Sequence, residues 1–300
     1  MQMKQSYFLD KMSVNKIYIP GSVWLYYKLY TGPKLADRIL TLYILPIIIQ
    51  IYDNRLIDKF FFIRYNDPDF HIRIRFKTKY INDLINILTP VWEQLVMEQK
   101  ISKVVIDSYE QEIGRYENEN MDIVESVFCV DSYSCIQILR HLQYIGEDLS
   151  NARWLLSIKL IDGVLNALKY NNMQRFSLMS NLAKGFREEF FFTAHNFTKQ
   201  INEKYRLYYF DICSIMKNED SPIDNIINER TKQLLMLFAS MKLNVDNVER
   251  IIGSIIHMSM NRWFRSQNRL YEMMVYSFME KYYKQQLFQK SKSNNFENNK

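Results

Sequence analysis

The sequence contains few residues that break or cross-link a chain, with only 7 glycines, 6 prolines and 3 cysteines among 300 residues. With 48% apolar residues, this scarcity excludes a collagen-like or low-complexity chain and predicts a packed globular protein. Neither G-x-G-x-x-G nor G-x-x-x-x-G-K-[ST] occurs, which excludes the common glycine-rich phosphate loops. The absence of H-E-x-x-H and G-x-S-x-G motifs argues against a zinc hydrolase and a serine nucleophile. We therefore expect no cofactor and no metal.

The sequence also lacks the usual signals of export. Cys129, Cys135 and Cys213 form no C-x-x-C pair, and their odd number is typical of reduced cytosolic thiols. No apolar signal-peptide core occurs in the first twenty residues. The most apolar stretch, residues 40–52, is too short to span a bilayer and predicts a buried helix. The net charge of +6 is too small to indicate a polyanionic partner. These features predict a cytoplasmic protein with no membrane span and no direct nucleic acid partner.

The first 118 residues alternate between strand and helix patterns. Helices are predicted at 35–51 and 81–99, and strands at 23–30, 60–65, 70–77 and 104–110. Pro90 should kink or split the second helix. The order β-α-β-β-α-β is that of a ferredoxin-like antiparallel sheet with helices on one side. We expect this fold in residues 1–118.

After about residue 118 the strand signal disappears. Helical periodicity predicts helices at 121–142, 151–170, 176–209, 223–241 and 245–284. The strongest breaks between them are Asn171-Asn172 and Ser221-Pro222. The fold class is therefore α+β, with a sheet unit followed by a mainly helical half at 119–289. We expect one packed body with a disordered tail at 290–300.

One strand combines an apolar face with a cationic face. Alternation along residues 70–76 places Ile72, Ile74 and Phe76 on one side and His71, Arg73 and Arg75 on the other. Guanidinium groups at positions i and i+2 lie about 7 Å apart and repel each other unless an anion or an acidic group lies nearby. A solvated outer face is one interpretation. The other is a carboxylate-binding site, because the planar guanidinium can hold a carboxylate through two hydrogen bonds.

The helix predicted from Val245 carries one polar stripe among its isoleucines. The stripe includes Arg250, His257, Asn261 and Arg265. Most histidines in such a position are hydrogen-bonded structural residues. A histidine that lines a cleft, with Asn261 one turn later, is instead a candidate general acid or base, since its unperturbed pKa is about 6.5.

Several separated segments together resemble one family. They are WLYYKLY at 24–30, FFIRYNDP at 61–68, HIRIR at 71–75, YEQEIGRY at 109–116, Asp131-Ser132, and HMSMNR at 257–262 with Glu272. This combination is similar to the C-terminal domain of lantibiotic dehydratases. The same domain occurs alone in thiopeptide-type bacteriocin biosynthesis. The resemblance extends from about residue 22 to residue 285.

The resemblance implies a glutamate-elimination enzyme. In that family a Ser or Thr of a precursor peptide, first esterified with glutamate from glutamyl-tRNA, loses its Cα proton and then glutamate. The product is dehydroalanine or dehydrobutyrine. The resemblance implies catalytic roles for Arg73, Arg75, Arg115 and His257. The family's usual Arg-Tyr-Gly-Gly reads Arg-Tyr-Glu-Asn at 115–118, so we expect a different turn after Arg115.

Further motif residues are expected to contact the substrate, namely Arg64, Tyr65, His71, Tyr116, Asn261 and Arg262. Only about twenty residues precede the first motif, so we expect a stand-alone elimination enzyme that works with a separate glutamylating protein. The glutamylated precursor peptide is the other expected partner, and we also consider a homodimer.

Two alternatives remain open at this point. Relatives in thiopeptide pathways join two dehydroalanines in a formal 4+2 cycloaddition that forms a pyridine ring, but they often lack the arginine and histidine set that this sequence retains. An RRM-like RNA-binding module shares the β-α-β-β-α-β order and exposes aromatic residues on its sheet. Against that module, residues 70–77 lack the glycine-rich aromatic RNP1 pattern.

Overall fold

The computed structural model describes residues 16–146, 149–189, 194–217 and 220–297. The chain divides into two compact units, each described here by itself. The first comprises residues 1–137 and 240–255, and the second comprises 138–239 and 256–300. These bounds differ from the predicted parts because two long helices, α6 (Met121–Ile145) and α12 (Val248–Trp263), each contribute to both units. One packed body stays a prediction.

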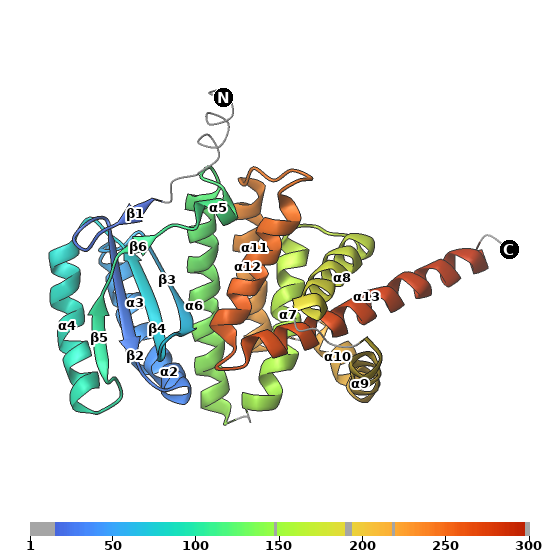
Figure 1. The fold of residues 1–300 in the computed structure, drawn as a ribbon, viewed down its shortest axis with the longest axis horizontal. Coiled ribbons are helices and arrows are strands. Elements are labelled where there is room, and N and C mark those ends of the chain that lie inside the picture. The colour runs from blue at the N-terminus through green and yellow to red at the C-terminus, as the bar shows by residue number, and fades with distance from the viewer. Residues whose placement is uncertain (1–15, 147–148, 190–193, 218–219, 298–300) are drawn as a thin grey trace, which may run out of the picture. The chain divides into compact units, whose positions relative to one another are not determined.

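A four-stranded antiparallel sheet forms the centre of the first unit (Figure 1). In spatial order its strands are β3 (Lys59–Asn66), β4 (Phe70–Lys77), β2 (Trp24–Tyr30) and β5 (Lys103–Ile106). On the outer side of β3, the backbone N–H of Phe62 donates to Ser132 Oγ of α6 at 3.1 Å. This contact covers an edge strand that would otherwise expose its backbone groups.

The strand predicted at 104–110 is two short strands in two different sheets. β5 ends at Ile106, and β6 (Tyr109–Glu110) pairs instead with β1 (Ile17–Tyr18). Between them the Asp107 side chain accepts a hydrogen bond from the N–H of Ser108 at 2.8 Å. Such a local bond from Asp favours a turn over a continuing strand.

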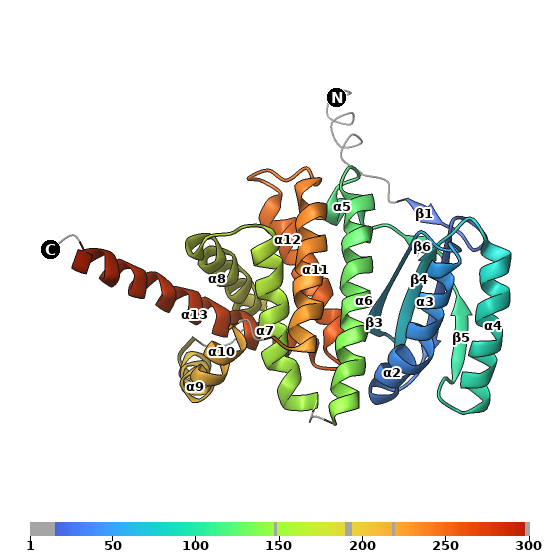
Figure 2. The same ribbon diagram turned by 180° about the vertical axis from the view of Figure 1, so that it is seen from behind.

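Helices cover the apolar face of the sheet (Figures 1 and 2). α2 (Pro33–Ile39), the π-helical turn η1 (Leu40–Ile44) and α3 (Leu45–Asp53) follow one another without a break. The wide turn ends two residues before Pro46, which has no N–H to donate. Residues 33–53 are long and apolar enough to cross a membrane, but 56% of their most apolar window is buried inside the protein. Burial of this extent is typical of a helix that packs in the core of a protein.

The second covering helix, α4 (Ile81–Met97), runs through Pro90 as one helix and is not split. Pro90 and Thr89 both lie on its exposed side. There the Thr89 hydroxyl donates to the carbonyl of Ile85 at 2.8 Å. A proline on the solvent side of a helix is tolerated because water can reach the carbonyl that loses its partner.

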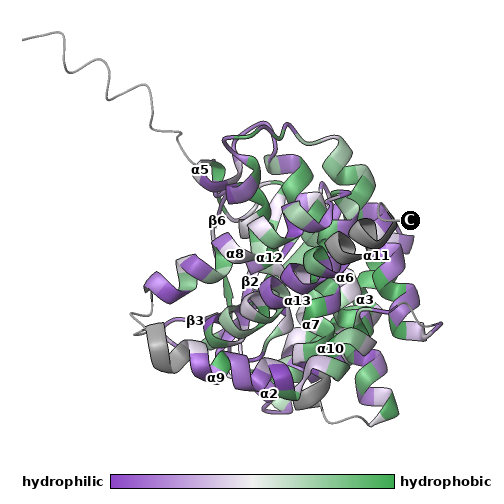
Figure 3. Ribbon diagram, turned by 90° about the vertical axis from the view of Figure 1, so that its right-hand side faces the viewer, coloured by the Kyte–Doolittle hydropathy of each residue, from purple (hydrophilic) through white to green (hydrophobic). Residues whose placement is uncertain are grey.

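The rest of the chain is helical. Its elements are α5 (Ile113–Tyr116), α6, α7 (Leu149–Ala167), α8 (Asn172–Glu189), α9 (Ala194–Leu207), α10 (Tyr209–Ile215), α11 (Pro222–Ala239), α12 and α13 (Asn268–Glu297). Most of them carry both hydrophobic and hydrophilic residues, as helices packed on one side do (Figure 3). The predicted breaks at 171–172 and 221–222 are confirmed. α13 runs to Glu297, beyond the predicted start of the tail, and residues 298–300 lie outside the described part.

The structure confirms the α+β class, with antiparallel sheets in the N-terminal part and helices in the remainder. The long helix predicted at 176–209 is divided between α8 and α9, and the one at 245–284 between α12 and α13. The ferredoxin-like assignment stays a prediction.

Candidate functional site

The residues of β4 separate into an apolar face and a cationic face. Ile72, Ile74 and Phe76 have no exposed surface and belong to the face that the helices cover. Arg73 and Arg75 lie on the other face, which we call the arginine face. The period-2 alternation predicted from the sequence is therefore confirmed for these side chains.

Arg75 is a buried cation that has no carboxylate partner among the residues that the structure describes. The side chain is 7% exposed, and its Nε has no hydrogen-bond partner. The guanidinium carbon lies 4.2 Å from the ring centre of Tyr26, 4.8 Å from that of Tyr109 and 5.3 Å from that of Phe61. Burial is the main cause that lowers the pKa of Arg75. An unpaired buried charge is costly, so this arrangement favours a bound anion.

Arg73 is held by the ring of Tyr65 and by His71. Its guanidinium carbon lies 3.4 Å from the ring centre of Tyr65, and its Nε donates to Nε2 of His71 at 3.1 Å. The opposite nitrogen, Nδ1, lies 2.8 Å from the carbonyl oxygen of Asp69. Because a carbonyl only accepts, Nδ1 carries the proton and Nε2 is free to accept from Arg73.

His71 is fully buried, with its ring 4.7 Å from that of Tyr30 and 5.6 Å from that of Tyr65. Burial is the largest effect that lowers the pKa of His71, and this favours the neutral ring that the hydrogen bonds require. His71 thus holds one side of the Arg73 guanidinium, and its predicted contact with a substrate stays a prediction. The Tyr65 side chain is exposed, and its predicted contact with a substrate stays a prediction.

Arg115 lies on α5, soon after the strand that supplies Tyr109. Its Nε is 3.1 Å from a carboxylate oxygen of Glu112, and both side chains are about half exposed. Glu112 also acts electrostatically on Arg75, whose pKa it raises. The same carboxylate is therefore linked to Arg75 and Arg115, which associates Arg115 with the arginine face.

The turn after Arg115 uses glutamate where the resemblance leads one to expect glycine. Glu117 has φ 65° and ψ 144°, a backbone conformation that glycine adopts more easily than other residues. Its carboxylate is held by Nη2 of Arg250 at 2.6 Å and by Nδ2 of Asn247 at 2.9 Å. The other terminal nitrogen of Arg250, Nη1, donates a hydrogen bond to the carbonyl of Gly114 at 3.2 Å. These contacts fix a turn with a positive φ angle despite the loss of glycine.

Two predicted contact residues of the first unit are buried. Arg64 is in register with Ile72, so it lies on the face that the helices cover, where its Nη2 is 2.7 Å from Oδ1 of the buried Asp37. Tyr116 is 1% exposed, and its ring packs 5.6 Å from that of Phe128. Arg64 and Tyr116 are thus part of the protein interior.

Sequence reasoning missed Tyr26, Tyr109 and Lys28 as parts of the arginine face. Lys28 lies directly opposite Arg73 in the β2–β4 register and is ion-paired with Asp107. The alternation of aromatic and basic residues along β2 indicates that Tyr26 and Lys28 share one face. Only the pairing of β2 with β4 shows that this face is the arginine face.

In the second unit, His257 of α12 is bound to a buried carboxylate of α13. Its Nδ1 lies 2.9 Å from Oε2 of Glu272, whose side chain has no exposed surface. The Tyr276 hydroxyl donates to the same oxygen at 3.3 Å. The carboxylate fixes Nδ1 as the nitrogen that carries the proton of the neutral ring, so Nε2 is the nitrogen with a free lone pair. The imidazole side chain is 29% exposed.

The two residues predicted beside His257 differ in burial. Asn261 lies one helical turn later and is partly buried, whereas Arg262 has no exposed surface. Among the described residues, no group of three or more His, Cys, Asp or Glu side chains is placed to hold a metal ion.

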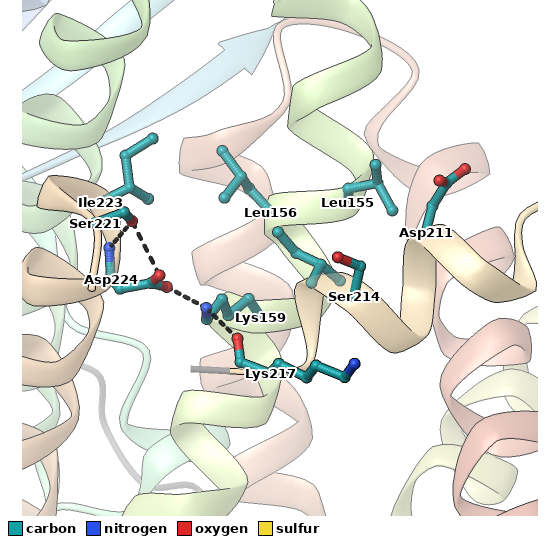
Figure 4. Close-up of a pocket in the computed structure, with 10 residues that line it drawn as sticks. Leu155, Leu156, Lys159, Asp211, Ser214, Lys217, Ser221, Ile223 and Asp224 are labelled. Carbon is teal, nitrogen blue, oxygen red and sulfur yellow. Dashed lines mark hydrogen bonds and ion pairs between the residues drawn. The ribbon is translucent and has the colours of Figure 1, made fainter. Parts of the chain in front are cut away.

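A cavity of about 320 Å³ also lies in the second unit (Figure 4). Apolar side chains such as Leu156 and Ile223 line it together with a buried ion pair between Lys159 and Asp224. Lys159 Nζ also donates to the carbonyl of Lys217 at 3.0 Å. None of the predicted site residues lines this cavity.

A sequence profile described as "Lantibiotic biosynthesis dehydratase C-term" matches residues 24–283. The chain belongs to this family. It is 28% identical over 278 residues to the subtilin biosynthesis protein SpaB of Bacillus subtilis, covering 85% of this chain and 25% of SpaB. It is 28% identical over 254 residues to the nisin biosynthesis protein NisB of Lactococcus lactis subsp. lactis, covering 81% of this chain and 24% of NisB. The chain therefore spans about a quarter of the length of these relatives.

Solved structures of low sequence identity share the fold of this family member. The tRNA-dependent lantibiotic dehydratase MibB from Microbispora sp. 107891 matches with a TM-score of 0.59 and 18% identity, over 87% of this chain and 28% of MibB. The pyridine synthase TbtD from thiomuracin biosynthesis matches with a TM-score of 0.51 and 11% identity, over 86% of this chain and 98% of TbtD.

Proposed function

We propose that this chain catalyses the elimination of glutamate from glutamylated Ser or Thr residues of a ribosomally made precursor peptide. The observation that carries the proposal is the buried, unpaired guanidinium of Arg75 beside Arg73 on the arginine face. Membership of the lantibiotic dehydratase family supports a precursor peptide as the substrate. A separate glutamylating protein, a cytoplasmic location and a homodimer are parts of the same proposal.

The arginines suit the charges that this reaction creates. Removal of the Cα proton generates negative charge next to a carbonyl, and departure of glutamate generates a carboxylate. Arg73 and Arg75 would bind the glutamyl carboxylates, and Arg115 would add a third cation. Preorganised donors of this kind stabilise the developing charge, and the loss of one typically lowers the rate by about 10² to 10³.

His257 is the proposed proton carrier, since its exposed edge can reach a substrate while Glu272 holds the opposite nitrogen. Proton transfer by a positioned side chain contributes about 10² to 10⁴ in rate. The proposal requires that His257 and the three arginines act on the same glutamyl ester. Asn261 and Tyr65 are the remaining proposed substrate contacts. Arg262, the next residue after Asn261, has no exposed surface and is not proposed as a contact.

The test uses the purified chain and a chemically glutamylated precursor peptide. Mass spectrometry should show loss of glutamate and formation of dehydroalanine or dehydrobutyrine. His257→Ala should leave the ester intact. An unchanged peptide with the wild-type protein, matching His257→Ala, would reject the proposal.

A second candidate is pyridine synthesis by cycloaddition of two dehydroalanines. The likeness to TbtD, which covers 98% of that chain, favours keeping this candidate. The unpaired Arg75 argues for elimination, since cycloaddition releases no glutamate. A peptide that already contains two dehydroalanines separates the two functions, because only a pyridine synthase would convert it to a macrocycle.

A further inference from the structure

Two consecutive tyrosines of β2 lie on opposite faces of the sheet. Tyr26 and Tyr27 are each 3% exposed. Tyr27 faces the covering helices, where its ring lies 5.6 Å from that of Trp92. Tyr26 is in register with Arg75 and shares the arginine face. The pair therefore offers two tyrosines of equal burial, of which only one adjoins the proposed site.

The surroundings of Tyr26 are strongly cationic. The Arg75 guanidinium lies 4.2 Å from its ring centre and the Lys28 ammonium 5.8 Å. Arg73 also acts on it electrostatically, and Asp107 is the one acidic group among the main influences on it. Within the described part of the chain, the Tyr26 hydroxyl makes no hydrogen bond, and it is not one of the fully buried polar atoms that lack a partner, so it is open to a ligand.

We propose that Tyr26 is a further catalytic residue, whose neutral hydroxyl donates a hydrogen bond to the ester carboxyl group of the glutamyl unit, which leaves as a carboxylate beside Arg75. This inference rests on the proposed function. The Tyr26 hydroxyl, which makes no hydrogen bond among the described residues, and the Nε of Arg75, which is buried without a partner, lie on one face of the sheet. A carboxylate has enough acceptor positions to accept a hydrogen bond from both.

The electrostatics of the face support a donor in its neutral form. Burial is the largest effect on Tyr26 and raises its pKa, and Asp107 acts in the same direction, while Arg75, Arg73 and Lys28 oppose it. The phenol therefore keeps its proton near neutrality. A phenolate would repel a carboxylate and could not donate to it.

Tyr26 transfers no proton in this scheme. The Cα–H bond breaks and its proton passes to the general base. Its electron pair forms the Cα=Cβ bond, and the bond from Cβ to the ester oxygen breaks, so that glutamate leaves with that electron pair. Negative charge grows on the departing carboxylate, so a hydrogen bond from Tyr26 strengthens in the transition state.

The first test compares Tyr26→Phe with Tyr27→Phe in the full chain, using a chemically glutamylated peptide. Tyr26→Phe should lower kcat by about 10- to 100-fold, somewhat less than the loss of a charged donor. Tyr27→Phe should stay within about two-fold of the wild type, because its hydroxyl lies on the other face. Thermal unfolding of both variants controls for folding. Equal activities of the two variants beside an active wild type would overturn the inference alone, whereas an inactive wild type would reject the proposed function and this inference with it.

The second test distinguishes a donor from a structural ring. Site-specific replacement of Tyr26 by a fluorinated tyrosine lowers the pKa of the phenol and keeps its shape. If the protonated hydroxyl is required, the loss of activity at alkaline pH should begin at a lower pH than in the wild type. The same replacement at Tyr27 should leave the profile unchanged. An alkaline limb that does not move for Tyr26 would contradict the inference.

Discussion

Nδ1 of His257 lies 2.9 Å from Oε2 of Glu272, a carboxylate whose side chain has no exposed surface. The two residues belong to consecutive helices, α12 and α13, so the turn between these helices fixes the pair. A buried carboxylate on one nitrogen of an imidazole sets its tautomer and its ring orientation. In the proposed reaction Glu272 thus acts through His257 as a positioning residue.

We predict that Glu272→Gln lowers the kcat of elimination by about 10²-fold or more, the lower end of the range for proton-transfer groups. A glutamine in place of the carboxylate can present its amide N–H to Nδ1 and favour the wrong tautomer. KM should change much less than kcat. The matched control is Glu280→Gln on the same helix, where Glu280 bonds Ser180 and Arg187. Equal loss of activity in both variants would show that α13 does not tolerate such a change at either position. It would contradict the positioning role of Glu272.

Two buried arginines on neighbouring strands should respond oppositely to replacement by methionine. Arg64 is paired with the buried Asp37, so Arg64→Met removes one partner of a buried ion pair and should lower the free energy of unfolding by about 3 to 5 kcal/mol. Arg75 has no carboxylate partner in the described part of the chain, and a methionine can keep contact with the three rings around it. Arg75→Met should change the free energy of unfolding by less than about 1 kcal/mol or raise it.

Urea unfolding of both variants, beside elimination assays, checks this contrast. Arg75→Met should remain folded and lose activity by about 10² to 10³. A destabilisation of Arg75→Met as large as that of Arg64→Met would mean that Arg75 serves the fold, and would weaken the case for an anion site.

The burial of His71 should make stability depend on pH. Burial lowers the pKa of His71 in the folded protein. Below the ordinary histidine pKa of about 6.5, the unfolded chain therefore binds a proton that the folded protein does not, and the free energy of unfolding falls with pH. His71→Gln keeps a donor toward Asp69 and an acceptor for Arg73 but does not titrate. Its stability should fall less steeply than that of the wild type between about pH 6.5 and pH 5. Identical slopes would contradict a neutral His71.

Glycine should be accepted at the turn after Arg115. Glu117→Gly relieves a positive φ angle but loses the contacts to Arg250 and Asn247, so we expect elimination activity within about three-fold of the wild type. Glu117→Val loses the same contacts and adds strain of about 1 to 3 kcal/mol, because a β-branched residue fits this backbone poorly. Comparison of thermal unfolding and activity for the two variants separates backbone strain from lost contacts. Equal behaviour would show that φ at Glu117 does not matter.

The sequence predicts the faces of β4 because a strand alternates with period two and only one of its faces is apolar. The same argument fails for β3, where Phe60 and Phe62 on one face and Phe61 and Ile63 on the other are all apolar. Nothing in that pattern shows that Arg64 lies opposite the arginine face. The pairing with Asp37, which decides its position, joins residues 27 apart in the chain.

Side-chain partners across strands were beyond prediction for a similar reason. Tyr26 and Lys28 join the arginine face through the register of β2 with β4, and a single sequence does not fix that register. Tyr109 joins it because the chain leaves the main sheet at Asp107 and begins a second one. The helical periodicity around His257 was readable, but Glu272 as its partner depends on the turn between α12 and α13.

A double-mutant cycle tests most directly whether the arginine face and His257 serve one reaction. Elimination rates are measured for the wild type, Arg75→Met, His257→Ala and the double variant, under single-turnover conditions. Residues that act on the same transition state are strongly non-additive, so the double variant should be at most a few-fold slower than the slower single variant. A double variant slowed by the full product of the two single effects would contradict the account.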